Sequence, residues 1–183
     1  MAKRDSKSQA TWTDVKARLA DLDRAGLLGL VHELYASHED NRTFLHARFG
    51  LGDILKSCKK IIDRWMWPDV LRGQDTSVSK AKQAISDYKK AVGDSAGLAE
   101  VMVFYCEQAA GFCDDVGYQD EAHFDAMVRM FEQAIKLAAT LLPGVRDILL
   151  ARLDRVRRLS HRFGYGVGDN MDSLFTKYGR REG

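Results

Sequence analysis

The chain has 183 residues, of which 45% are hydrophobic and 30% charged, which is enough to bury a sizeable core. Its three cysteines form no CxxC pair, which excludes a disulfide framework and favours a reducing compartment. The polar segment MAKRDSKSQA lacks the apolar core of a signal peptide, and no stretch approaches about 18 consecutive apolar residues. We therefore expect a cytoplasmic protein that does not span a membrane.

Apolar residues recur at helical spacing along nearly the whole chain, and no alternating strand pattern is flanked by turn residues. The sequence predicts an all-α fold, either a multi-helix bundle or a short stack of antiparallel helical hairpins. We expect a single domain over residues 11–179, between disordered ends at 1–10 and 180–183. The predicted helices cover, in chain order, about residues 12–24, 27–36, a short segment ending at 48, 53–67, 78–92, 95–116, 120–141, 145–163 and 169–178.

Turn and capping residues set these predicted boundaries. Gly26 is expected to join the first two helices, and the Ser37 hydroxyl to cap the short helix that follows them. Gly117 and the Pro143-Gly144 pair separate the three long helices. The helix over residues 78–92 is expected to bury a narrow seam formed by Val78, Ala81, Ile85, Tyr88 and Val92.

Charge is segregated along the chain, although the total is only +2. Residues 93–132 have a net charge of −8, with nine acidic residues against the single basic residue Arg129. Residues 50–92 and 133–183 have net charges of +4 and +5. A nearly neutral total therefore hides strong local fields, which are typical of surfaces that meet charged partners.

Three carboxylates in the acidic region share one side of a predicted helix. Glu100, Glu107 and Asp114 are spaced by seven residues and border an apolar face. The functional interpretation is a polar groove that binds a cation or a basic partner. The structural interpretation, which we favour, is a set of salt bridges between helices, because ion pairs at helix borders are common.

Four arginines of the helix after Pro143 are the plausible partners: Arg152, Arg155, Arg158 and Arg162. Arg152 falls within the apolar stripe of that helix, where an unpaired guanidinium would cost several kcal/mol. The sequence therefore predicts that Arg152 pairs with an acidic residue of the 94–132 region. The alternative is that these arginines contact phosphates of RNA or DNA.

A second basic surface runs along two earlier helices and is the basis of a nucleic-acid hypothesis. It lies opposite an apolar face, which is usual for a solvated surface, and it lacks interleaved aromatic side chains. The candidate contacts are Lys56, Lys59, Lys60, Arg64, Lys80, Lys82 and Lys89.

No set of residues predicts catalysis, a metal or a cofactor. Asp120 and His123 amount to half a metal site at best, and an N-cap role for Asp120 is favoured. A metal protein or enzyme would need Glu100, Glu107, Asp114 and His123 to converge on one pocket. Trp67 is a candidate anchor at a protein interface, although packing at the helix end is the favoured interpretation.

The segments LVHELYAS at residues 30–37 and DNRTFLHARF at 40–49 together resemble a family of small, uncharacterised bacterial proteins. The resemblance covers about twenty residues. It implies a bacterial, cytoplasmic, all-helical protein and brings no known activity with it. In this pattern Asn41 and Arg42 belong to the first turn of a helix, where they either mark a binding surface or stabilise the helix start.

The hypothesis that the sequence favours is a non-enzymatic protein-interaction module, self-associating or binding another protein through its charge-segregated helices. The alternative is a nucleic-acid-binding accessory protein that uses the lysine-rich faces. A carboxylate and histidine metal protein is the third hypothesis.

Overall fold

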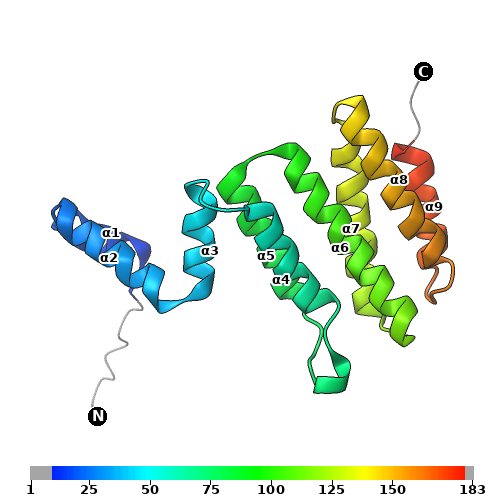
Figure 1. Ribbon diagram of the computed structural model, residues 1–183, viewed down its shortest axis with the longest axis horizontal. Helices are drawn as coiled ribbons and strands as arrows, with labels where there is room; N and C mark the ends of the chain where they lie inside the picture. The colour runs from blue at the N-terminus through cyan, green and yellow to red at the C-terminus, as the bar shows by residue number, and fades with distance from the viewer. Residues whose placement is uncertain (1–9, 180–183) are drawn as a thin grey trace, which may run out of the picture. The chain divides into compact units, whose positions relative to one another are not determined.

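A computed structural model describes residues 10–179, apart from the side chains of residues 40, 43 and 47. The described residues form α-helices and turns without a strand, which confirms the predicted all-α class (Figure 1). The predicted disordered ends at 1–10 and 180–183 lie outside the described residues, except for Ala10. The helices are α1 (Trp12–Ala20), α2 (Arg24–Ser37), α3 (Glu39–Arg48), α4 (Ile54–Met66), α5 (Val78–Val92), α6 (Ser95–Val116), α7 (Glu121–Ala139), α8 (Pro143–Ser160) and α9 (Val167–Tyr178), with a 3-10 turn at Val70–Arg72.

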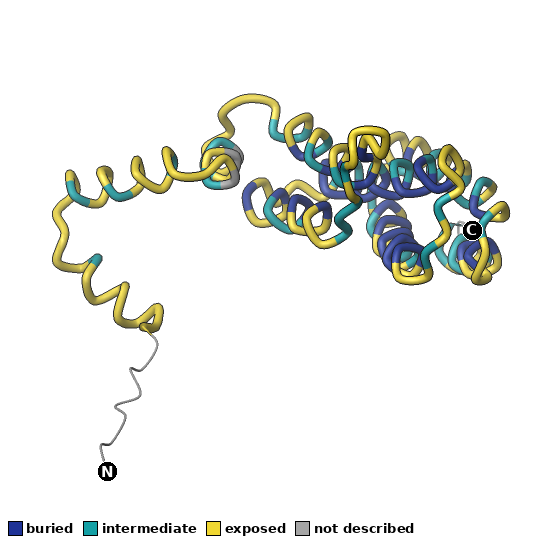
Figure 2. Tube along the Cα trace, turned by 90° about the horizontal axis from the view of Figure 1, so that it is seen from below, coloured by how far each residue is buried: buried dark blue, intermediate teal, exposed yellow. Residues whose placement is uncertain are grey.

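The chain divides into two compact units, where the sequence analysis expects one. The first ends at Leu45 and contains α1, α2 and most of α3, and the second begins at His46 and contains α4 to α9. The division falls inside α3. Only the second unit has a hydrophobic core, because none of the described residues of the first unit is buried (Figure 2).

Helix α6 is the central element of the second unit. It contacts α4, α5, α7 and α8, and α9 completes the unit by contacting α7 and α8. Its 22 residues include only four with a charged side chain, so most of its circumference can be buried against other helices. Tyr105, Ala109 and Phe112 face the core together with Phe124 and Phe131 of α7, and all five are at most 1% exposed.

Helix boundaries in the second unit follow the capping residues of the sequence. The carboxylates of Asp53, Asp94 and Asp120 each accept hydrogen bonds from backbone N–H groups of the helix that follows. Gly93 and Gly117 end α5 and α6 with φ near +67° and +66°, a conformation that glycine adopts without steric cost. The predicted spans 78–92 and 95–116 are therefore confirmed.

Two predicted details of α8 and α5 are wrong. Helix α8 begins at Pro143 rather than at residue 145, because proline fits the first helical position, where its missing N–H is not needed. Val92 is 37% exposed and does not belong to the buried seam of α5, whereas Ala84 and Ala91 do.

The predicted boundaries around α2 are also wrong. Asp23 caps this helix by accepting a hydrogen bond from the Gly26 N–H, so Gly26 lies inside the first turn instead of between two helices. Ser37 is the last residue of α2, and its hydroxyl donates to the Leu34 carbonyl rather than capping α3. Asn41 also donates to that carbonyl, at 2.8 Å, and thereby ties the start of α3 to the end of α2.

Candidate functional site

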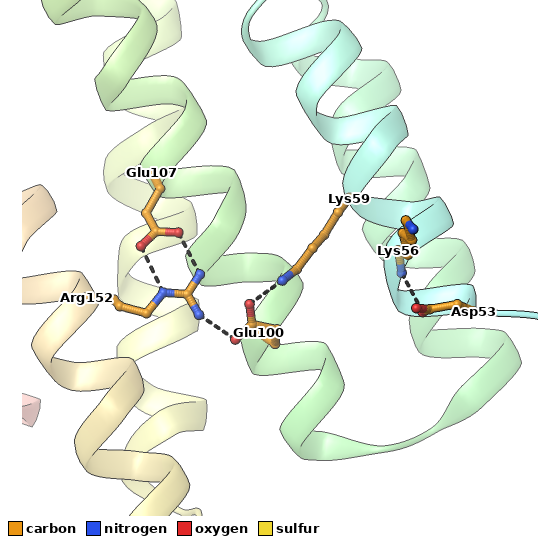
Figure 3. A network of polar contacts seen from close by, with 6 residues as sticks. All are labelled: Asp53, Lys56, Lys59, Glu100, Glu107 and Arg152. Atoms are coloured by element: carbon orange, nitrogen blue, oxygen red, sulfur yellow. Dashed lines mark hydrogen bonds and ion pairs between the residues drawn. The ribbon is translucent and has the colours of Figure 1, made fainter.

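The predicted pairing of Arg152 is confirmed. Arg152 of α8 makes a two-pronged contact with Glu107 of α6, at 2.8 Å from Nε to Oε1 and 2.6 Å from Nη2 to Oε2 (Figure 3). Its third nitrogen, Nη1, donates to Glu100 Oε2 at 2.5 Å. All three guanidinium nitrogens therefore donate a hydrogen bond, and the bidentate contact with Glu107 is the stronger type of arginine–carboxylate contact.

Lys59 of α4 completes the group. Its ammonium lies 2.5 Å from the second carboxylate oxygen of Glu100 (Figure 3). The same ammonium is 5.2 Å from the ring centre of Phe104. Glu100 therefore bridges a cation of α4 and a cation of α8, and the four side chains balance in formal charge. We call Lys59, Glu100, Glu107 and Arg152 the ionic network. It joins three helices across the surface of α6.

The ionic network is mostly shielded from solvent, with side-chain exposures of 17% for Arg152, 21% for Glu100 and 28% for Glu107. Partial burial pushes the pKa of Glu100 upward, but the hydrogen bonds from Lys59 and Arg152 outweigh it and leave the pKa below its usual value. Hydrogen bonds from Arg152 to Glu107 raise the arginine pKa further above its usual value, against the effect of burial. Both carboxylates of the network are thus occupied by internal partners.

The remaining predicted arginines have different positions. Arg162 lies beyond the end of α8 at Ser160, although the sequence predicts it inside that helix. It contacts Asp114 at 3.0 Å, and we call Glu100, Glu107 and Asp114 of α6 the acidic line. Arg158 contacts Asp154 of its own helix at 2.7 Å. Arg155 is exposed. The structure therefore pairs all three carboxylates of the acidic line with arginines, two with Arg152 of α8 and one with Arg162, as the structural interpretation expects.

Trp67 lies against a glycine of α6. A Cβ atom placed on Gly111 would come within 2.3 Å of the Trp67 ring, and Trp67 as a whole residue is 40% exposed. The absence of a side chain at Gly111 lets the indole cover the helix backbone. This contact matches packing at the helix end, which the sequence analysis favours over an interface anchor.

The lysine-rich faces are partly used by internal contacts. Lys59 belongs to the ionic network, and the charged groups of Lys80 and Arg64 lie 3.9 Å and 4.4 Å from the ring centre of Trp65. The contact of Lys80 with Trp65 joins α5 to α4, whereas Arg64 is on the same helix as Trp65. The side chains of the other four predicted contacts are exposed: Lys56, Lys60, Lys82 and Lys89.

His123 is buried in an aromatic group and takes no part in the ionic network. Its ring contacts those of Phe112, Tyr118 and Phe124, it is 2% exposed, and neither ring nitrogen has a hydrogen-bond partner among the described residues. Burial lowers the pKa of His123 and outweighs the Asp120 carboxylate, which raises it. The hypothesis that His123 and the acidic line form a metal or catalytic pocket has no geometric support.

We expect the buried neutral His123 to make stability depend on pH. Because its folded-state pKa is below the unfolded value of about 6.5, the unfolded state binds more protons in the interval between the two values. Above about pH 6.5, His123 therefore does not lower the free energy of unfolding. This free energy decreases as the pH drops from about 6.5 toward the folded-state pKa. Urea unfolding across this range should show the loss in the wild type and in His32→Gln, but a smaller loss in His123→Leu. An unchanged pH dependence in His123→Leu would contradict this assignment.

A second group, at the contact of α8 with α9, was not predicted. The potential ligand atoms of His161, Asp169 and Asp172 lie within 4.8 Å of one another, in an exposed or half-buried position. Asp172 is already engaged, because one oxygen accepts from Arg157 and the other lies 3.2 Å from His161 Nε2. The group is thus explained as a polar contact between two helices.

The three thiols lie in the core. Cys58, Cys106 and Cys113 are at most 4% exposed. Burial raises the pKa of Cys58 and of Cys113 to about 12, and that of Cys106 also rises. Thiols held in the protonated form are poor nucleophiles and metal ligands. This agrees with the small-core role that their apolar helix faces predict.

The surface feature that the sequence analysis missed is in the first unit. Eight large apolar side chains of this unit are at least 40% exposed, and we call them the N-terminal apolar surface. The sequence pattern that could have revealed this surface is the helical spacing of apolar residues in helices that are too short to build a core of their own. The eight residues are Trp12, Val15, Leu22, Leu27, Leu28, Val31, Leu34 and Phe44.

Comparison of the chain with family models, curated proteins and solved structures found no match, and the resemblance carried by residues 30–37 and 40–49 stays a prediction. Within residues 10–179, no helix is both long enough and apolar enough to cross a membrane.

Proposed function

We propose that the protein is a non-enzymatic protein-interaction module that binds its partner through the N-terminal apolar surface. One observation carries this proposal: the first unit exposes eight large apolar side chains and has no buried residue among those described. Contiguous apolar patches larger than a few hundred Å² are rare on monomers and mark interaction sites. Helices as short as α1 and α2 are also marginally stable in water without packing.

The charged surfaces support recognition less well than the sequence predicts. The carboxylates of Glu100 and Glu107 are occupied by Lys59 and Arg152, and Asp114 is paired with Arg162. Charges that are satisfied internally add little to binding a partner. The exposed lysines of α4 and α5 contribute to the surface field and would steer an acidic partner rather than hold it.

The proposed setting is a reducing cytoplasm, as the resemblance and the cysteines suggest. The three cysteines described in the structure are free and buried, which is compatible with a compartment that forms no disulfides.

Purification from a native-like host tests the proposal. We expect the tagged full chain to retain a protein partner, with an absorbance ratio at 260 and 280 nm that shows no nucleic acid. The variant Leu27→Glu/Leu34→Glu should lose that partner while keeping a cooperative unfolding transition. Nucleic acid that is released at moderate salt would instead favour the lysine-rich faces and reject the proposal.

A further inference from the structure

Six of the eight residues of the N-terminal apolar surface form two stripes. On α1 and the turn after it, Trp12, Val15 and Leu22 recur with the half-buried Leu19 at helical spacing, and on α2 the stripe is Leu27, Val31 and Leu34. Neither stripe is covered within the first unit (Figure 2). Two amphipathic helices without a common core need apolar surface from another source.

The charged side chains of α1 and α2 restrict which kind of partner can cover the two apolar stripes. Residues 12–37 have three basic side chains, Lys16, Arg18 and Arg24, against four acidic ones, Asp14, Asp21, Asp23 and Glu33. Helices that lie on membranes or bind nucleic acid carry an excess of positive charge on the polar face. This balance disfavours both, and the partner that matches the surface is apolar protein.

The size of the surface fits a dimer. The six large apolar side chains of the two stripes, each at least 40% exposed, offer on the order of several hundred Å², and each partner of a standard interface buries about 800 Å² including its polar rim. In a two-fold dimer the same patch meets itself, so one surface per chain is sufficient. The two apolar stripes carry no charge that would repel a second copy.

We infer that the N-terminal apolar surface is the interface of a homodimer in which α1 and α2 of one chain pack against α1 and α2 of a second copy. This inference rests on the proposed function and names the partner of the same surface. The four helices together would form a core that neither chain builds alone.

Sedimentation velocity and light scattering of the full chain test the inference. We expect twice the chain mass of 20.6 kDa in the wild type, and a dissociation constant raised about a hundredfold or more in Leu27→Glu/Leu34→Glu, since losing one interface hot spot commonly costs tenfold or more. The matched control is Leu71→Glu, a change at a 96% exposed leucine of the second unit, which should remain dimeric. Thermal unfolding should show that both variants keep the core of the second unit.

Two outcomes would overturn the inference: a wild type that stays at the mass of one chain at the highest concentration, or a dimer that the double variant leaves intact. Co-expression of tagged and untagged chains separates this failure from that of the proposed function. A tagged chain that retains a different protein, loses it in the double variant and never retains the untagged copy rejects the homodimer alone. Retention of no protein rejects both.

Discussion

Replacing Arg152 with methionine should destabilise the protein by about 2–4 kcal/mol, because removing one partner of a shielded ion pair leaves the other charge uncompensated. Arg152 is the only cation in the ionic network that contacts both carboxylates, and Glu107 would keep no ionic partner within it. Methionine preserves the apolar stem of the side chain, so the loss reports on the charge rather than on packing. The free energy of unfolding from urea titration measures the effect.

Arg155→Met is the matched control, since Arg155 is exposed on the same helix and its loss should cost less than about 0.5 kcal/mol. The double variant Arg152→Met/Glu107→Leu should recover at least half of the lost stability, because it removes the orphaned charge while Lys59 still neutralises Glu100. If Arg152→Met were as stable as the control, the ionic network would not contribute measurably to the free energy of unfolding.

The role of Arg152 could be predicted because its register is unambiguous. Leu149, Leu153 and Val156 define the buried stripe of α8, and an arginine inside that stripe must find an acidic partner. The acidic residues of α6 recur every seven positions, which keeps them on one side of the helix. Local periodicity therefore specified which two helix faces meet.

The participation of Lys59 could not be predicted from the same periodicity. Lys59 lies beside Lys56 and Lys60 on what the pattern indicates is a solvated face, yet it reaches Glu100 across the contact of α4 with α6. Which flank of α4 faces α6 depends on the angle at which the helices pack, and this angle is a property of the whole core. The division of the chain into two units could not be predicted from periodicity either. Periodicity shows that a helix is amphipathic, but it does not show whether another helix covers the apolar face.

Asn41 shows the limit of capping rules at a helix junction. The sequence predicts that Ser37 caps the start of α3, because a small hydroxyl residue precedes acidic positions there. In the structure the Ser37 hydroxyl and the Asn41 amide both donate to the Leu34 carbonyl, so the junction is stabilised from the C-terminal end of α2. The same residue types serve either end of a helix, and only the path of the chain decides between them.

Gly111→Ala should destabilise the protein by about 1–2 kcal/mol, although alanine is the better helix former by about 1 kcal/mol. The new Cβ would come within 2.3 Å of the Trp67 ring, so the indole must move away from α6 and lose its contact with the helix. Gly144→Ala is the control, because a Cβ on that glycine of α8 would meet nothing within 4 Å and should be neutral or stabilising.

The decisive experiment combines the change at Gly111 with a change at Trp67. In a Trp67→Leu background the ring is gone, so Gly111→Ala should change sign and stabilise the protein by up to about 1 kcal/mol through its helix propensity alone. The four free energies of unfolding then form a double-mutant cycle that isolates the contact of Trp67 with α6. The same loss from Gly111→Ala in both backgrounds would mean that the clash arises elsewhere, and Trp67 would again be available as an interface anchor.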